Sequence, residues 1–131
     1  MSIKIKSQTV FATYIALPGI NAGELEEKTF MESRIFYNEN GKIISGSKYF
    51  PSGKSESSII KKYDEKDNLT EELHFISGNE PAERKTFKYD ENNLPVAEYT
   101  HYLDNTFDTT MFVYNENNIL VEKRTYDSDN Q

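Results

Sequence analysis

Two histidines are the side chains of this sequence best suited to acid–base or metal chemistry near neutral pH, because the chain contains no cysteine. His74 and His101 directly precede the aromatic residues Phe75 and Tyr102, so we place them at equivalent positions of two similar segments. Equivalent strands in a meander of hairpins lie about 10 Å apart, and two imidazoles at that distance do not share one zinc ion. We therefore expect both histidines to be structural, and the sequence predicts no metal site.

Acidic and amide side chains form two clusters, one starting at Asp64 and one at Asp90. Clustered oxygen ligands suit calcium, but neither cluster has the glycine at the sixth position and the glutamate at the twelfth that a calcium loop needs. Asn and Asp also favour tight turns, because they tolerate a positive φ angle. We interpret both clusters as turns, and the sequence predicts no cofactor and no enzymatic reaction.

Charge is distributed unevenly along the chain, which has a formal net charge of −7. Residues 1–62 carry 9 basic and 6 acidic side chains, whereas residues 63–131 carry 6 basic and 16 acidic ones. An acidic surface repels the phosphate backbone, so we expect no nucleic-acid partner.

Three glutamates, Glu71, Glu98 and Glu122, each stand two residues after an aliphatic residue, which predicts an acidic ladder on one face of a sheet. One interpretation is a solvated face, in which the cross-strand partners are Lys61, Lys85 and Arg124. The other is a negative stripe that binds a basic protein surface. On the second interpretation, the predicted partner-binding residues are Glu71, Glu72, Glu98, Glu122, Asp64, Asp90, Tyr99 and Tyr102.

The elements that position these residues follow from an internal repeat. The triplet Tyr-(Asn or Asp)-Glu begins at Tyr37, Tyr63, Tyr89 and Tyr114, at spacings of 26, 26 and 25 residues. Each triplet precedes a cluster of turn-forming residues, which predicts a hairpin turn. We expect Tyr63 and Tyr89 to anchor the ends of their strands in the core or at its border.

A second rule follows each turn, where an aliphatic residue precedes an aromatic one by six positions. Six is even, so both side chains of a pair lie on one face of a strand, whereas a helix would separate them. Each repeat is therefore predicted to be a two-stranded hairpin. The pairs are Ile44 and Phe50, Leu69 and Phe75, Val96 and Tyr102, and Leu120 and Tyr126.

The sequence predicts an all-β fold, an antiparallel β-meander of about four hairpin repeats of 25–26 residues, either a curled single sheet or an open barrel or sandwich. Length and 17 aromatic residues favour a single domain over residues 1–131. Residues 32–131 hold the repeats, and residues 1–31 add one or two strands over Ser7 to Leu17 and a short helix over Asn21 to Lys28. The repeat strands are expected at residues 31–37, 42–50, 57–63, 68–76, 84–89, 94–102, 109–114 and 119–126.

The motifs at Tyr37, Tyr63, Tyr89 and Tyr114 resemble the bacterial YD repeats of Rhs-type proteins and, less closely, variant MORN repeats. The resemblance covers about residues 32–131. It implies a hairpin-repeat architecture and a small binding protein, of the kind that acts as an immunity or antitoxin partner of a secreted bacterial toxin. It implies no catalytic residues.

We therefore expect a non-enzymatic immunity or antitoxin-type protein that neutralises a cognate toxin by covering its active site. No apolar stretch approaches the roughly 20 residues that span a bilayer, and the alternation of Ile3 and Ile5 with Lys4 and Lys6 favours a strand over a secretory leader. The expected protein is a cytoplasmic monomer without a membrane partner.

Two other functions stay open at this point. A scaffold protein would self-associate through exposed sheet edges, against which edge lysines protect, here Lys61, Lys62, Lys85 and Lys88. A small-ligand or glycan binder would use exposed aromatic rings, here Tyr49, Tyr99 and Tyr102.

Overall fold

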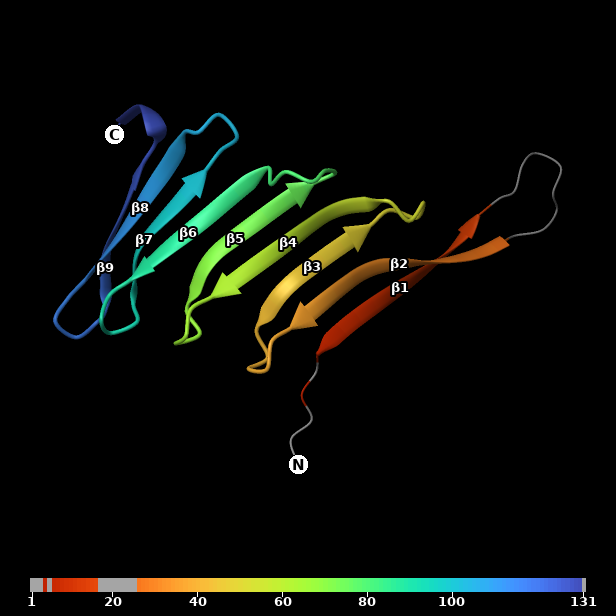
Figure 1. Cartoon of the computed structure of the whole chain (residues 1–131), viewed down its shortest axis with the longest axis horizontal. Coiled ribbons are helices and arrows are strands. Elements are labelled where there is room, and N and C mark those ends of the chain that lie inside the picture. Colours follow the sequence, from red (N-terminus) through yellow and green to blue (C-terminus); the bar gives the residue numbers. More distant parts are fainter. Residues whose placement is uncertain (1–3, 5, 17–25, 131) are drawn as a thin grey trace. The chain divides into compact units, whose positions relative to one another are not determined.

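The computed structural model describes residues 4, 6–16 and 26–130, and within them the chain is all-β. Nine strands form an antiparallel meander in which each strand is followed by its neighbour in the sheet (Figure 1). This confirms the predicted fold class. The strands are β1 (Ser7–Ala16), β2 (Glu26–Tyr37), β3 (Ile43–Tyr49), β4 (Ser55–Tyr63), β5 (Leu69–Ile76), β6 (Glu83–Tyr89), β7 (Pro95–His101), β8 (Phe107–Tyr114) and β9 (Leu120–Tyr126), and a 3-10 helix, η1 (Ser128–Asn130), follows.

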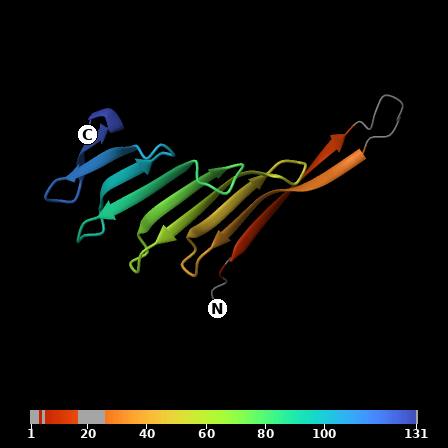
Figure 2. The same ribbon diagram turned by 45° about the horizontal axis from the view of Figure 1, so that its top comes forward.

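The chain divides into two compact units, Met1–Ser58 and Ile59–Gln131, called here the N-terminal and the C-terminal unit. The N-terminal unit contains β1 to β3, and the C-terminal unit contains β5 to β9. Within the C-terminal unit, β5 to β9 lie side by side in both views (Figure 2). A single domain over residues 1–131 stays a prediction.

The four motif tyrosines each end a strand, and the same turn follows each of them. In the first turn, the Oδ1 atom of Asn38 accepts hydrogen bonds from two backbone N–H groups, two and four residues later, both at 3.0 Å. Asp64, Asp90 and Asn115 accept the equivalent pairs in the other three turns. The motif therefore needs Asn or Asp after the tyrosine, because this side chain supplies the acceptor for the turn's N–H groups.

The fourth residue after each motif tyrosine has a positive φ angle. The values are 79° at Gly41, 67° at Asp67, 62° at Asn93 and 61° at Asn118. Glycine enters this left-handed region freely, and Asn and Asp tolerate it better than other residues, which explains the residue types found there. The predicted hairpin turn after each tyrosine is confirmed.

A β-bulge follows the first, third and fourth motif turns, which are the turns for which the strand pairing is described. Tyr89 lies opposite Pro95, whereas Lys88 lies opposite Ala97, so Val96 is the extra residue of β7. Ile44 and Val121 are the extra residues in the hairpins of the first and fourth motifs. A bulge bends the strand and shifts the register by one residue, so it decides which later side chains share a face.

The geometry of the turns corrects the second sequence rule. In each turn, the backbone N–H of the residue after the motif tyrosine donates to a carbonyl four residues later, and the next residue begins the following strand. The equivalent residues that begin these strands are Ile43, Leu69, Pro95 and Leu120. The rule had used Ile44 and Val96 instead. It was therefore wrong by one residue in the first and third repeats.

The first hairpin differs from its prediction. One strand, β1, runs from Ser7 to Ala16, and β2 begins at Glu26 although the prediction was residue 31. Glu26 and Glu27 pair with Ala16 and Ile15 of β1, and these backbone bonds favour a strand. The predicted helix is therefore wrong at residues 26–28, and its earlier part lies outside the described residues.

Side chains in this sheet are shielded only in part. Among the described residues, Ala97 alone is fully buried, with 2% of its surface exposed. Tyr63 and Tyr89 are half-buried, which fits their predicted place at the border of a core. No helix in the described ranges is long and apolar enough to cross a membrane.

Candidate functional site

Strand register divides the side chains of the C-terminal unit between two faces. Thr86 of β6 lies opposite Glu71 of β5 and Tyr99 of β7, and residues directly opposite in antiparallel strands point to the same side. We call this side the Tyr99 face. The adjacent residues Lys85 and Glu98 point to the other side, called the Glu98 face.

The predicted acidic ladder is wrong, because its three glutamates do not share a face. Glu122 lies opposite Val113 on the Tyr99 face, together with Glu71, whereas Glu98 lies on the Glu98 face. The place equivalent to Glu71 and Glu122 in the third repeat is occupied by Ala97. Val96 stands one residue further from its motif tyrosine than Leu69 and Leu120 do, and a slip of one residue moves a side chain to the opposite face.

Basic side chains pair with every glutamate of the predicted partner-binding set. On the Tyr99 face, Glu71 accepts from Lys62 at 2.9 Å and from Arg84 at 2.8 Å. The hydrogen bond from Lys62, followed by that from Arg84, lowers the pKa of Glu71, although partial burial opposes this shift. Glu122 pairs with Arg124 of the same strand.

On the Glu98 face, charges of alternating sign cross four strands. Lys61 of β4 lies 3.5 Å from Glu72 of β5, which is directly opposite Lys85 of β6. Lys85 in turn lies 3.4 Å from Glu98 of β7. These pairs favour the interpretation as a solvated face, and they confirm Lys85 as the partner of Glu98.

The other two partner assignments differ from the prediction. Lys61 pairs with Glu72 and not with Glu71. Arg124 lies on the same strand as Glu122, two residues later, and is therefore not a cross-strand partner. The four lysines predicted to protect sheet edges are also misplaced. They belong to β4 and β6, which are inner strands of the sheet order.

An aromatic cluster lies on the Tyr99 face of β7 and β8. The ring centroids of Tyr99 and Phe107 are 6.3 Å apart in an edge-on arrangement, and the His101 ring lies 5.8 Å from that of Phe107. The His101 Nε2 atom is 3.1 Å from the Thr86 hydroxyl, and the Lys88 ammonium lies 5.4 Å from the Tyr99 ring centre. Burial, and secondly the charge of Arg84, lower the pKa of His101, so this ring is neutral at pH 7.

Next to this cluster, exposed apolar side chains continue across β8 and β9. Phe107, Met111 and Val113 alternate along β8, and Tyr126 lies opposite Thr109 on the same face. Their surfaces are 37%, 38%, 42% and 38% exposed, respectively. We call Phe107, Met111, Val113 and Tyr126 the apolar patch. Sequence reasoning missed it, although alternate apolar residues ahead of the Tyr114 turn were a usable signal.

The remaining predicted site residues do not join this surface. The Tyr102 hydroxyl donates to Asp108 at 2.9 Å, and Asp108 lies opposite Thr100 on the Glu98 face. Tyr99 and Tyr102 therefore point to opposite faces and do not form one aromatic ligand surface. Tyr49, the third ring of that prediction, belongs to β3 in the N-terminal unit.

Asp64 and Asp90 serve the turns. They line a shallow hollow of about 330 Å³, where Asn68 donates to Asn93 of the next motif turn at 3.1 Å. Hydrogen bonds from the backbone N–H of Asn68, and then of Lys66, lower the pKa of Asp64. The described residues contain no group of three or more His, Asp or Glu side chains arranged to hold a metal ion.

The two histidines are not equivalent, contrary to the prediction. His74 lies on the Glu98 face with its Nε2 atom 3.1 Å from Glu72, whereas His101 lies on the Tyr99 face. Phe75 stands six residues after Leu69, the first residue of β5, and His101 stands six residues after Pro95, the first residue of β7. Phe75 is therefore the residue that corresponds to His101. His74 stands 11 residues after its motif tyrosine and His101 stands 12 residues after its own, which explains the error.

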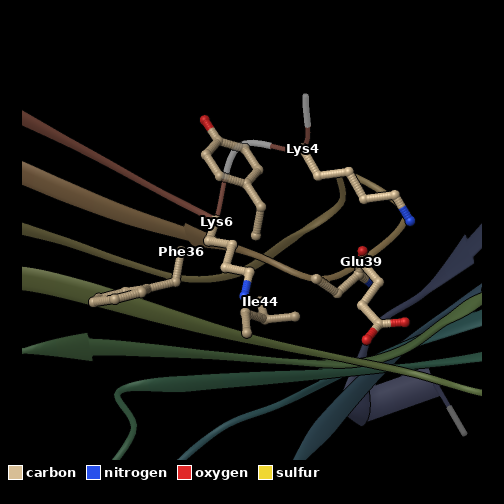
Figure 3. Close-up of a pocket in the computed structure, with 7 residues that line it drawn as sticks. Lys4, Lys6, Phe36, Glu39 and Ile44 are labelled. Carbon is tan, nitrogen blue, oxygen red and sulfur yellow. The ribbon is translucent and has the colours of Figure 1, made fainter. Parts of the chain in front are cut away.

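A separate hollow of about 550 Å³ lies in the N-terminal unit (Figure 3). Phe36 and Ile44 supply apolar walls, and the charged side chains of Lys4, Lys6 and Glu39 surround them. The hollow therefore combines apolar surface with charges of both signs.

No protein-family model matches the chain, and no curated protein matches it. The resemblance to YD and MORN repeats stays a prediction.

Proposed function

We propose that this chain is a non-enzymatic protein-binding module and that its C-terminal unit contacts the partner through the apolar patch. Exposed apolar residues that lie together on one face are typical of protein–protein interfaces. The observation that carries the proposal is the joint exposure of Phe107, Met111, Val113 and Tyr126 on the Tyr99 face.

Two features beside the patch support binding of a protein. Aromatic rings and a guanidinium group are enriched in interface centres, and Tyr99 and Arg84 lie on the same face as the patch. The rings of Tyr99, His101 and Phe107 contact one another, so these side chains lose little conformational freedom when a partner binds.

The immunity or antitoxin role is the specific form of this proposal. In this form, a cytoplasmic protein covers the active site of a cognate toxin with the Tyr99 face. The glutamates predicted from the sequence to bind the partner do not form the binding surface in this proposal. Because Glu71, Glu72 and Glu98 are paired with basic side chains, they contribute little to binding, and the apolar patch provides the affinity.

Co-expression with the product of the neighbouring reading frame tests this role. We expect the two proteins to co-purify and the chain to suppress growth inhibition by that product. A Met111→Lys, Val113→Lys variant places two charges in the patch and should lose both effects. Glu98→Lys on the other face is the control and should retain them. Failure of the unaltered chain to co-purify or to protect would contradict the immunity role.

Self-association is a second candidate function, favoured by the strand order. β1 and β9 are the end strands of the meander, and both expose large apolar side chains, among them Phe11 and Ile15 at 65% and 62%. Unpaired edge strands offer backbone hydrogen-bonding groups to another chain.

A further inference from the structure

We propose that β9 is a self-complementary edge, through which two copies of this chain pair as antiparallel strands about a two-fold axis at Lys123. β9 is the last strand of the sheet order, and its outer side has no neighbouring strand among the described residues. This surface is the outer edge of β9, and it adjoins the apolar patch, to which Tyr126 of β9 contributes.

The sequence of β9 reads symmetrically about its centre. The strand runs from Leu120 to Tyr126, so Lys123 is its middle residue. Antiparallel pairing about a two-fold axis at that residue places Glu122 of each copy opposite Arg124 of the other. Each of the two contacts thus joins opposite charges, and both lie on the Tyr99 face.

One further cross-strand pair follows in the same register. Val121 of one copy comes opposite Thr125 of the other, and both side chains lie on the Glu98 face. Val121 is 59% exposed in the single chain, so pairing covers apolar surface that water now contacts. Leu120 lies opposite Tyr114, so the bulge at Val121 puts it on the Glu98 face, away from Tyr126 of the other copy.

One pair in this register joins like charges, because the two Lys123 side chains lie opposite each other. The Lys123 ammonium lies 5.7 Å from the centre of the Phe112 ring of its own sheet. This cation–π contact directs the charge toward β8 and away from the axis. Moving the two-fold axis by one residue, to Glu122 or to Arg124, would place that residue opposite its own copy, so like charges would meet there. The move would also break both contacts between Glu122 and Arg124.

Sedimentation of the full chain tests the pairing through charge. The interface is small, so we expect a monomer–dimer equilibrium with a dissociation constant of about 100 μM. Glu122→Arg and Arg124→Glu should each weaken dimerisation at least about tenfold, because like charges then face each other. An equimolar mixture of these two variants should restore a dimer, since each charge meets its opposite. The double variant with both substitutions should also dimerise.

Cross-linking provides the second readout. The chain has no cysteine, and the two residues at the axis have Cα atoms about 4.5 to 5.5 Å apart, within reach of a disulfide. Lys123→Cys should therefore form a covalent dimer under mild oxidation. Thr125→Cys is the matched control and should not, because its two copies are separated by four residues along the strands.

Three results would overturn the proposal. They are a chain that stays monomeric up to about 1 mM, single charge variants that dimerise like the unaltered chain, and equal cross-linking of the two cysteine variants. Circular dichroism of each variant, expected to match the unaltered chain, separates a lost interface from a lost fold.

Discussion

At the scale of single residues, the hydroxyl groups of two motif tyrosines connect successive repeats. Tyr89 donates to the carbonyl oxygen of Leu69 at 2.7 Å, and Tyr114 donates to that of Pro95 at 2.6 Å. Leu69 and Pro95 begin the strands that follow the preceding motif turns. Each tyrosine therefore holds its own strand end against the previous hairpin, while its ring covers part of the sheet.

Substitution of Tyr89 should separate these two contributions. Tyr89→Phe removes the donor to Leu69 and should lower the free energy of unfolding by about 1 kcal/mol. Tyr89→Ala also removes a half-buried ring and should cost roughly 2 kcal/mol or more. Tyr102→Phe is the control, because this exposed ring should change stability by less than about 0.5 kcal/mol. Urea denaturation measures all three, and equal stability of Tyr89→Ala and the unaltered chain would contradict the anchoring role.

His101 should make stability depend on pH. Its pKa is lower in the folded chain than the usual 6.5, so the folded state binds fewer protons than the unfolded state. Its contribution is present above about pH 6.5 and is lost as the pH falls through the lowered pKa. Phe75 occupies the corresponding place, so His101→Phe should fold and lose less stability between pH 7.5 and 5. Denaturation midpoints at the two pH values measure this, and parallel curves for both proteins would contradict it.

At the scale of elements, the turn after each motif tyrosine is the unit that the sequence specifies most directly. An Asn or Asp side chain closes the turn, and a residue tolerant of positive φ ends it. These requirements fall on particular residue types, so they are visible in the sequence as a motif.

Asp64 tests this specification. Asp64→Asn should keep the thermal midpoint close to that of the unaltered chain, because Asn38 and Asn115 accept the same hydrogen bonds in their turns. Asp64→Ala removes the acceptor and should lower the midpoint. Glu65→Ala in the same turn is the matched control. Equal midpoints for the Asn and Ala variants would show that the side chain does not hold the turn.

The count from each motif tyrosine explains why the fold was predictable and the faces were not. Turn chemistry depends on residue type, so the motif predicted the hairpins, their number and their order. The first residue of the following strand has no distinctive type, so Ile44 and Val96 were counted in place of Ile43 and Pro95. This one-residue error placed Glu98 on the face of Glu71, and the aromatic cluster around Tyr99 went unrecognised.

At the scale of the whole molecule, ion pairs and apolar exposure divide the C-terminal unit into regions with different roles. Charged pairs cover β4 to β6 on both faces, whereas exposed apolar residues gather over β8 and β9 on one face. Surface ion pairs contribute little to stability, about 0 to 1 kcal/mol each, and keep the sheet hydrated. The proposed binding surface therefore lies on β8 and β9.

The dependence of partner affinity on salt tests this assignment most directly. Titration calorimetry with the co-purified partner, at 50 mM and 500 mM salt, measures it for the unaltered chain and for a Glu71→Lys, Glu98→Lys variant. If the apolar patch provides the affinity, the dissociation constant should change less than about threefold with salt, and the variant should bind within about threefold of the unaltered chain. A loss of affinity of about tenfold or more in high salt, together with failure of the variant to bind at low salt, would contradict binding through the apolar patch. It would show that the glutamates form the binding surface.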